Sequence, residues 1–397
     1  MSDFPLVELH STSIQIIDGD RGVNYPKKTE FSEQGYCLFL DSSNLTKNGF
    51  DFSSKTFISK AVDERMGKGR LQRGDLVMNT RGTIGNIGLY SDNIPFESVR
   101  INSGMVIIRG GKDYDTRFLY LFLRSNLFFL QTKNLMSGSV QKQLPVSVIK
   151  YVKLPKVNLP TQQKIAAVLS ALDAKIELNQ RINAELESMA KTLYDYWFVQ
   201  FAPHKSAGGK MVWNEELKRN VPAGWEVKTL GTVCDIYQPK TISEKEMMSD
   251  GKYLVFGANG IVGRYDKFNH VESEIVITCR GASCGNILRT RPNSWITGNA
   301  MVIHSTSESI SSEFVFQALG WLDIRKVITG SAQPQITRTN LVPLKLLVPP
   351  TEILQKFNEF CKPNVEKRLS ILRENDQLTE LRDWLLPMLM NGQVKVS

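Results

Sequence analysis

The stretch NTRGTIGN at residues 79–86 returns, with one residue added, as TCRGASCGN at residues 278–286. Both copies contain an Arg-Gly pair followed by a Gly-Asn pair. The cysteines of the second copy, Cys279 and Cys284, have no counterpart in the first copy. A metal or redox site would need its thiolates in both copies if both copies do the same job. The repeated property is therefore a backbone shape that carries an arginine.

The repetition extends beyond this turn. SGSVQKQL at residues 137–144 matches TGSAQPQI at residues 329–336, since both contain Gly-Ser-x-Gln-x-Gln before an aliphatic residue. YVKLPKVNLPTQQKI and VPLKLLVPPTEILQKF follow, each an apolar run, then prolines, then a threonine that opens a helical pattern. Such self-similarity indicates an internal repeat. Each half is predicted to be a mixed globular block, a proline-marked exit and a long helix.

The first long helix is predicted over residues 161–201, with Thr161 as N-cap and Pro203 preventing continuation. Forty residues at 1.5 Å each span roughly 60 Å, which favours a coiled-coil strut over a helix lying on its own domain. Asn179 is one polar member of the stripe. The apolar members have three–four spacing and are Ile165, Leu169, Leu172, Ile176, Ile182, Leu186, Met189, Leu193 and Tyr196.

The second long helix is predicted over residues 351–390. Pro363 and Pro387 predict breaks near Lys362 and Leu386, because proline removes a helix hydrogen bond. Gly392 is the expected terminal cap. The two long helices are predicted to pack on each other and bury both stripes. The second stripe includes Phe357, Val365, Leu369, Leu372, Leu378, Leu385 and Leu389.

A chain of 397 residues predicts two or more domains. The globular blocks read as α/β or α+β, with short strands such as DLVMNT, INSGMVIIR, SEIVITC and NAMVIHS. FLYLFLRSNLFFLQ and EFVFQALGWLDIRKVI read as buried helices. The predicted segments are a first globular block (1–158), the first helix (159–202), a second block with its leading linker (203–349), and the second helix with the C-terminal tail (350–397).

Several function classes are disfavoured. The chain has no run of eighteen apolar residues and no signal-peptide pattern, so neither a membrane span nor secretion is expected. Five scattered cysteines fit a reducing cytoplasm, and the four histidines lack metal-ligand spacing, so no metal is expected. No [N/D]-P-P-[Y/F] methyltransferase tetrapeptide, phosphate-binding loop or serine nucleophile elbow is present. The sequence therefore predicts no catalytic residue.

The charge pattern points to a polyanion. Lys and Arg outnumber Asp and Glu by 20 to 15 in residues 1–155 and by 17 to 13 in residues 201–350. Residues 156–200 and 351–397 are balanced. Two basic blocks favour nucleic acid, although an ordinary solvated surface explains the charge on its own equally well.

Polar, glycine-rich loops supply the candidate nucleic-acid contacts. Arg and Lys neutralise phosphates, and Arg, Gln and Asn pair with base edges in the major groove. An alternative for Arg81 and Arg280 is a structural role, in which they bond loop carbonyls. In the first block the candidates are Arg21, Lys27, Lys28, Lys68, Arg70, Arg73, Arg81, Ser139, Gln141, Lys142 and Gln143. In the second block they are Asn259, Arg264, Lys267, Arg280, Ser331, Gln333, Gln335 and Arg338.

The whole chain resembles the specificity subunit of Type I restriction–modification systems. LPTQQKIAAVLSALDAKIELNQRINAELESMAKTLYDYWFVQF looks like the central region of that family, and VPAGWEVKTLGTVC is similar to the usual start of its second recognition domain. YLVFGANGIVGRYD looks like a recognition-domain loop, and LRDWLLPMLMNGQVKV like the C-terminal tail. The first block lacks a GANG loop and has CLFLDSSNLTKNGF, residues 37–50, in the comparable place.

The resemblance implies two target recognition domains that read different halves of a split, asymmetric site in double-stranded DNA. It implies that the helices form an antiparallel coiled coil that sets the spacer. Methyltransferase subunits, expected to be two, would dock there and be joined by restriction and translocase subunits. S-adenosylmethionine, ATP and Mg would belong to those partners. The expected coiled-coil and partner residues are Ile165, Leu172, Ile176, Leu186, Leu193, Trp197, Phe198, Leu369, Leu372, Leu378, Trp384 and Leu385.

Two rival functions remain open at the level of sequence. The first is a DNA-modifying enzyme with its own catalytic site, which the missing cofactor motifs disfavour. The second is a stand-alone two-headed DNA or RNA adaptor without methyltransferase partners. The long apolar stripes and the large residues near the helix ends disfavour the adaptor, because such surfaces suit partner proteins.

Overall fold

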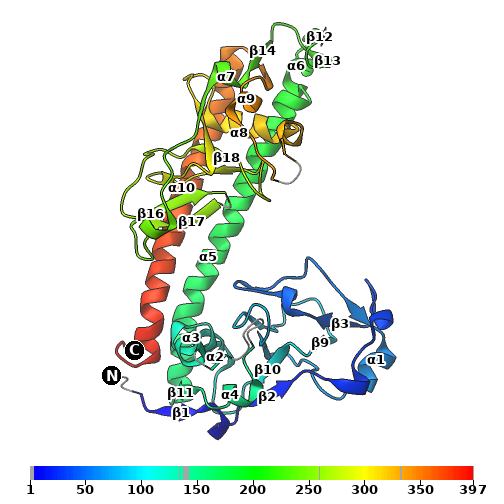
Figure 1. Cartoon of the computed structure of the whole chain (residues 1–397), viewed down its shortest axis with the longest axis vertical. Helices are drawn as coiled ribbons and strands as arrows, with labels where there is room; N and C mark the ends of the chain where they lie inside the picture. The colour runs from blue at the N-terminus through cyan, green and yellow to red at the C-terminus, as the bar shows by residue number, and fades with distance from the viewer. Residues whose placement is uncertain (1–3, 134, 137–142, 259, 331–332, 397) are drawn as a thin grey trace. The chain divides into compact units, whose positions relative to one another are not determined.

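The structure is a computed structural model that describes residues 4–133, 135–136, 143–258, 260–330 and 333–396 (Figure 1). The chain divides into a first unit, made of Met1–Leu178 and Asn375–Ser397, and a second unit, made of Asn179–Glu374. Each unit contains one mixed α/β body and a part of each long helix. The division therefore groups each body with nearby helix segments, whereas the predicted segments kept bodies and helices separate.

The first unit is built on an antiparallel sheet in the order β2-β10-β7-β8. Its central strands, β7 and β10, are buried because helices cover one face and a second sheet, β6-β3-β9, covers the other. The elements are β1 Leu6–Glu8, β2 Gln15–Asp18, β3 Cys37–Leu40, β4 Leu45–Thr46, β5 Gly49–Phe50, β6 Phe57–Ile58, α1 Lys60–Arg65, β7 Leu76–Asn79, β8 Ile87–Leu89, β9 Val99–Ile101, β10 Met105–Arg109, α2 Thr116–Leu123, α3 Asn126–Lys133, α4 Val146–Ile149 and β11 Lys153–Pro155.

The second unit repeats this plan. Its main sheet has the order β15-β21-β18-β19, and in its second sheet β16 pairs parallel to β20, as β3 pairs parallel to β9. The elements are α6 Ala202–Ser206, β12 Met211–Asn214, β13 Arg219–Pro222, β14 Glu226–Thr229, α7 Leu230–Val233, β15 Cys234–Tyr237, β16 Tyr253–Gly257, β17 Gly260–Tyr265, β18 Ile275–Thr278, β19 Ile287–Arg289, β20 Trp295–Ile296, β21 Ala300–Ser305, α8 Ser312–Trp321, α9 Arg338–Leu341 and β22 Lys345–Val348. The predicted repeat and fold class are therefore confirmed.

The first long helix, α5, covers Leu159–Tyr194 and continues as a π-helical turn, Asp195–Val199. The expectation that Thr161 caps it was wrong, because the helix starts two residues earlier. The side chain of Asn158 accepts the N–H of Thr161 at 2.9 Å and acts as the N-cap. Pro160 then lies in the first turn, where a missing N–H has no intrahelical partner to lose.

The second long helix, α10, covers Thr351–Met390 as predicted and is one uninterrupted helix. The predicted breaks at its two prolines were wrong. Each proline removes one donor, but buried side chains on both sides of Pro363, namely Cys361 and Arg368, hold the helix in place. Gly392 follows the last turn with a φ of +82°, which confirms the predicted cap.

Within each unit the two long helices run antiparallel. Residues later in α5 contact residues earlier in α10. In the first unit Asp173 pairs with Arg382, and the carbonyl of Ile176 meets Asn375. In the second unit Asn179 donates to Glu374, Glu187 pairs with Arg368, and Phe198 contacts Phe357. The predicted polar member of the stripe, Asn179, is buried and bonded to the opposite helix.

The predicted stripe residues differ in burial. Ile165 and Phe198 are buried, and Trp384 is 55% exposed. Trp197 is partly buried and packs against Phe198 and Phe357 of the core of the second unit. Neither Trp197 nor Phe198 therefore supplies the open partner surface expected near the helix end. The remaining positions are partly buried and are Leu172, Ile176, Leu186, Leu193, Leu369, Leu372, Leu378 and Leu385. Ile371 is a core residue that the predicted stripe omitted.

Candidate nucleic-acid interface

The repeated motif forms the same hydrogen-bonded turn in both units, between β7 and β8 and between β18 and β19. In the first unit the N–H to carbonyl pairs are Asn79 to Asn86, Gly85 to Asn79, Thr80 to Gly104, and Leu144 to Thr80. In the second unit they are Thr278 to Asn286, Gly285 to Thr278, Cys279 to Asn299, and Ile336 to Cys279. These bonds also connect the turn to the other repeated motif, because Leu144 and Ile336 end the two Gln-x-Gln stretches.

The glycines of the motif are required by the backbone. Gly82 and Gly85 have φ values of +70° and +85°, and Gly281 and Gly285 have +83° and +92°. Residues with a Cβ rarely adopt this left-handed region. The repetition of both glycines is therefore explained by the shape of the turn.

Each turn presents an exposed arginine beside a glutamine. Arg81 is bridged through its backbone to Gln143, and Arg280 is bridged in the same way to Gln335. Among the described residues neither guanidinium has a hydrogen-bond or ion-pair partner, which favours an outward function over the structural alternative. The predicted contacts Ser139, Gln141, Lys142, Asn259 and Ser331 lie outside the described residues.

In the first unit two of the predicted nucleic-acid contacts lie beside the turn at residues 102–104, between β9 and β10. The guanidinium of Arg21 donates to the carbonyl of Ser103 and to Asp18, both at 3.3 Å. A Cβ on Gly104 would lie 3.8 Å from the Cβ of Arg81. Arg21 and Arg81, which lie sixty residues apart in sequence, therefore flank the same turn.

The glycine-rich loop at residues 67–70 joins this group through Asp20. The carboxylate of Asp20 accepts the N–H of Gly67 at 2.7 Å. Burial raises the pKa of Asp20, but the backbone donors of Gly67, Arg21 and Lys68 outweigh it and lower that pKa overall. Lys68 and Arg70 are exposed on this loop. Two loops that the sequence suggested separately thus form one basic edge of the first unit.

Arg73 has a structural environment. Its guanidinium lies 4.4 Å from the centre of the Tyr90 ring and donates to the carbonyls of Ser91, Ile94 and Phe96. These contacts stabilise the loop after β8, so Arg73 is left out of the contacts proposed below. Lys27 and Lys28 are exposed around a short 3₁₀ turn, Lys28–Glu30.

In the second unit the predicted contacts divide in the same way. Arg264 is partly buried and donates to the carbonyl of Gly251 at 3.1 Å, which holds the β17 hairpin. The exposed candidates are Lys267, Arg280, Gln333, Gln335 and Arg338.

Different loops lie against the two repeated turns. In the second unit the side chains of Thr278 and Ser283 donate to the carbonyl of Ala258, within the FGANG stretch. In the first unit Asn79 donates to the carbonyl of Ser42, within the CLFLDSSNLTKNGF segment. The expectation that this segment takes the comparable place is therefore confirmed.

The two cysteines of the second copy have a packing role. Cys279 is buried in the core, and its thiol contacts the carbonyl of Asn299 at 3.2 Å. Cys284 is partly buried, and burial raises its pKa. Across the described ranges, no three His, Cys, Asp or Glu side chains gather as metal ligands would.

A buried ionic network in the second unit had no sequence signal. Glu313 of α8 pairs with Arg289 of β19 at 2.8 Å and with Arg368 of α10 at 3.7 Å. Arg368 also pairs with Glu187 of α5. The network borders a cavity of about 420 Å³. Because its charges alternate, the network joins four elements rather than presenting free charge to a ligand.

None of the described helices is both long enough and apolar enough to cross a membrane. The functional evidence thus lies in the two repeated turns, their exposed arginines and the loops beside them.

Comparisons with known proteins agree with this arrangement. Residues 15–188 and 222–374 match the family model described as the Type I restriction modification DNA specificity domain. The chain is 26% identical over 352 residues to the Type I restriction enzyme MjaIX specificity subunit of Methanocaldococcus jannaschii, covering 82% of this chain and 78% of that protein. It is 30% identical over 356 residues to the EcoprrI specificity subunit of Escherichia coli, covering 84% and 83%.

Structural similarity supports the fold. The crystal structure of the Type I restriction–modification S subunit from M. genitalium aligns with a TM-score of 0.59 and 17% identity, covering 98% of this chain and 96% of that one. Two repeated recognition bodies, long helices and a family match over most of the chain lead to one assignment. The chain belongs to the Type I restriction–modification DNA specificity family and is a non-catalytic specificity subunit.

Proposed function

We propose that this subunit reads an asymmetric, bipartite site in double-stranded DNA, with one half-site read by each unit. The observation that carries the proposal is the duplicated turn, which presents Arg81 in one unit and Arg280 in the other. Because both units contain this turn, each unit can present its arginine to the DNA duplex in the same way. Different neighbouring loops, residues 37–50 and the FGANG loop, then give each unit its own base preference.

The side chains of these loops suit phosphate and base contacts together. Exposed cations such as Lys68 and Lys267 neutralise phosphates, and the glutamines beside the arginines, Gln143 and Gln335, can pair with adenine edges. Phosphate contacts set the position of each unit, and base contacts supply its specificity.

The long helices are the proposed docking surface for two methyltransferase subunits, through which restriction and translocase subunits join. Large apolar side chains remain exposed on them, among them Met189 at 53%, Phe360 at 58% and Trp384 at 55%. Exposed apolar surface of this kind is stabilised by a protein partner. S-adenosylmethionine, ATP and Mg would be bound by those partners.

The test is a genome-wide map of adenine methylation in cells with this gene and its neighbouring methyltransferase gene, compared with a deletion of this gene alone. The proposal requires a split motif that disappears on deletion. An unchanged map would contradict it and favour the two-headed adaptor without methyltransferase partners.

Single substitutions then separate recognition from folding. Arg81→Ala should abolish methylation of the split motif while the complex still assembles, because the side chain has no partner among the described residues. Arg117→Ala, which removes an exposed arginine from α2 in the same unit, is the matched control and should leave methylation unchanged. Loss of assembly in Arg81→Ala would show a structural role instead.

A further inference from the structure

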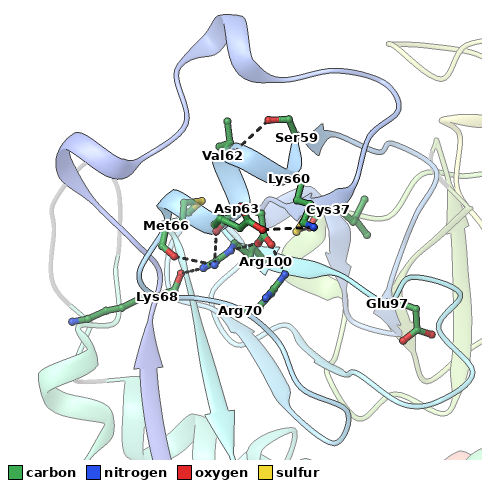
Figure 2. A network of polar contacts seen from close by, with 12 residues as sticks. Cys37, Ser59, Lys60, Val62, Asp63, Met66, Lys68, Arg70, Glu97 and Arg100 are labelled. Atoms are coloured by element: carbon green, nitrogen blue, oxygen red, sulfur yellow. Dashed lines mark hydrogen bonds and ion pairs between the residues drawn. The ribbon is translucent and has the colours of Figure 1, made fainter.

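The first unit contains a fully buried carboxylate that binds two arginines. Asp63 lies on α1 with its side chain 0% exposed, and it pairs with both Arg100 and Arg70 (Figure 2). A buried carboxylate needs one positive partner to offset its desolvation. A second arginine exceeds what charge balance alone requires.

Arg100 supplies the positive charge that the carboxylate needs, but it reaches only Oδ1 of Asp63, and Oδ2 accepts its hydrogen bond from Arg70. The side chain of Arg100 is 5% exposed, and besides Asp63 it donates to the carbonyls of Lys68 at 2.6 Å and Met66 at 2.9 Å. The neighbouring Cys37 adds no charge, since burial and then the nearby Asp63 raise its pKa to about 12. Asp63 and Arg100 thus balance in charge inside the unit, and Arg70 completes the hydrogen bonds of the carboxylate from the surface.

Arg70 adds a second positive charge beside Arg100. Its backbone is bridged directly opposite Arg100, and like charges facing each other across a ladder destabilise a sheet. The side chain is 48% exposed and reaches Asp63 through one terminal nitrogen. Over the described residues its Nε and other terminal nitrogen have no partner. A local rule broken in this way is typical of a functional position.

The surroundings place Arg70 on the basic edge described above. It ends the loop in which Lys68 is exposed and Gly67 is bound by Asp20. Gly69 has a φ of +83°, and a Cβ there would meet Gly19 at 3.4 Å, so the loop is held closely against the segment that carries Arg21. Arg70 is therefore fixed by a buried anchor while part of its guanidinium stays open to solvent.

We propose that Arg70 reads a guanine in the half-site of the first unit and that Asp63 is the positioning residue that holds it for this contact. The inference rests on the proposed function and deepens it. A planar guanidinium with open donors matches the O6 and N7 acceptors of guanine in the major groove. Holding it on Asp63 before binding reduces the side-chain entropy lost when the contact forms.

The experiment uses the subunit in complex with its methyltransferase and duplexes that carry the mapped split motif. Each guanine of the first half-site is replaced in turn by 7-deazaguanine, which lacks the N7 acceptor. At one of these positions the replacement should weaken binding of the duplex by the wild-type complex. Arg70→Ala should weaken binding to the unmodified duplex by about 5- to 150-fold and should no longer distinguish the modified from the unmodified duplex at that position.

Two further variants separate charge from geometry. Arg70→Lys keeps the charge but loses the planar fork, so it should lose the guanine sensitivity as Arg70→Ala does. Lys68→Ala removes an exposed cation two residues away and is the matched control. It should weaken binding to all duplexes equally and keep the guanine sensitivity of the wild type. Asp63→Asn leaves Arg100 buried without its counter-charge and is expected to unfold, so the test depends on the Arg70 variants.

Three results would overturn the inference. Equal weakening of every duplex by Arg70→Ala would make Arg70 a phosphate contact. Arg70→Ala leaves Oδ2 of the buried Asp63 without a donor, so its urea midpoint is expected to fall. Loss of assembly in that variant, or guanine sensitivity that survives in it, would make Arg70 a structural brace. Failure of the proposed function has a different signature, because the wild-type complex would then bind no split motif at all.

Discussion

The aromatic cluster at which α10 begins gives a quantitative test of how the second unit is held together. Phe357 is 0% exposed, and its ring lies 5.0 Å from Phe198 and 6.3 Å from Tyr194, between centroids. Replacing a buried phenylalanine by alanine costs about 3–5 kcal/mol through lost transfer energy and the cavity left behind. Because domains are stable by only about 5–15 kcal/mol, Phe357→Ala should remove a large part of the stability of this unit.

The measurement is urea unfolding of the full chain, followed by tryptophan fluorescence, to which Trp197 and Trp225 contribute from within the cluster. With a slope of about 2–3 kcal/mol/M, the midpoint should fall by about 1–2.5 M. Phe360→Ala is the matched control, because this side chain is 58% exposed one turn along the same helix. It should change stability by no more than about 0.5 kcal/mol. Equal shifts for the two variants would refute the assignment of Phe357 to the core.

Three further tests address the backbone, an ion pair and the thiols. Gly285→Ala should lower stability by about 1–2 kcal/mol in urea unfolding, because its φ is +92° and a Cβ would meet Ile328 at 3.2 Å. Gly320→Ala is the control and should raise stability, because Gly320 lies inside α8 with open space around it. Stability changes of the same sign in both variants would contradict this reasoning. Hydrogen bonds from Arg65 lower the pKa of Glu30 from 4.5 to about 2. Its stabilisation should therefore be complete above pH 4.5 and disappear as the pH falls toward 2, so the urea midpoints of wild type and Glu30→Gln should converge there; a constant difference would contradict the ion pair. A thiol reagent at pH 8 should modify Cys284 first, because the other four cysteines are buried, and mass spectrometry showing equal rates for two sites would contradict that order.

The parts of the fold that could be predicted correctly had local signals in the sequence. Apolar residues at three–four spacing marked α5 and α10, and the duplicated glycines marked the two turns. The proline breaks failed because tertiary packing overrides propensity, as Cys361 and Arg368 show on either side of Pro363.

The candidate site was predictable by residue type but not by environment. Arg73 and Arg70 look alike in GKGRLQR, yet Arg73 is enclosed by the carbonyls of its own loop. The network of Arg289, Glu313 and Arg368 joins residues from separate elements, so no regular spacing of residues in the sequence predicts it. Pairing between distant side chains depends on the folded backbone, which a pattern of residue types does not contain.

The hydrogen bonds of the repeated turns use backbone atoms and the side chains of neighbouring residues such as Asn79 and Thr278, so none of them depends on the arginine that the turn presents. The backbone is stabilised by glycines and ladder bonds, while Arg81 and Arg280 project without partners among the described residues. The atoms that stabilise each turn are therefore distinct from the side-chain atoms that are proposed to contact DNA. Under the proposed function, the presented side chain can be exchanged, and the half-site with it, without a compensating change in the core.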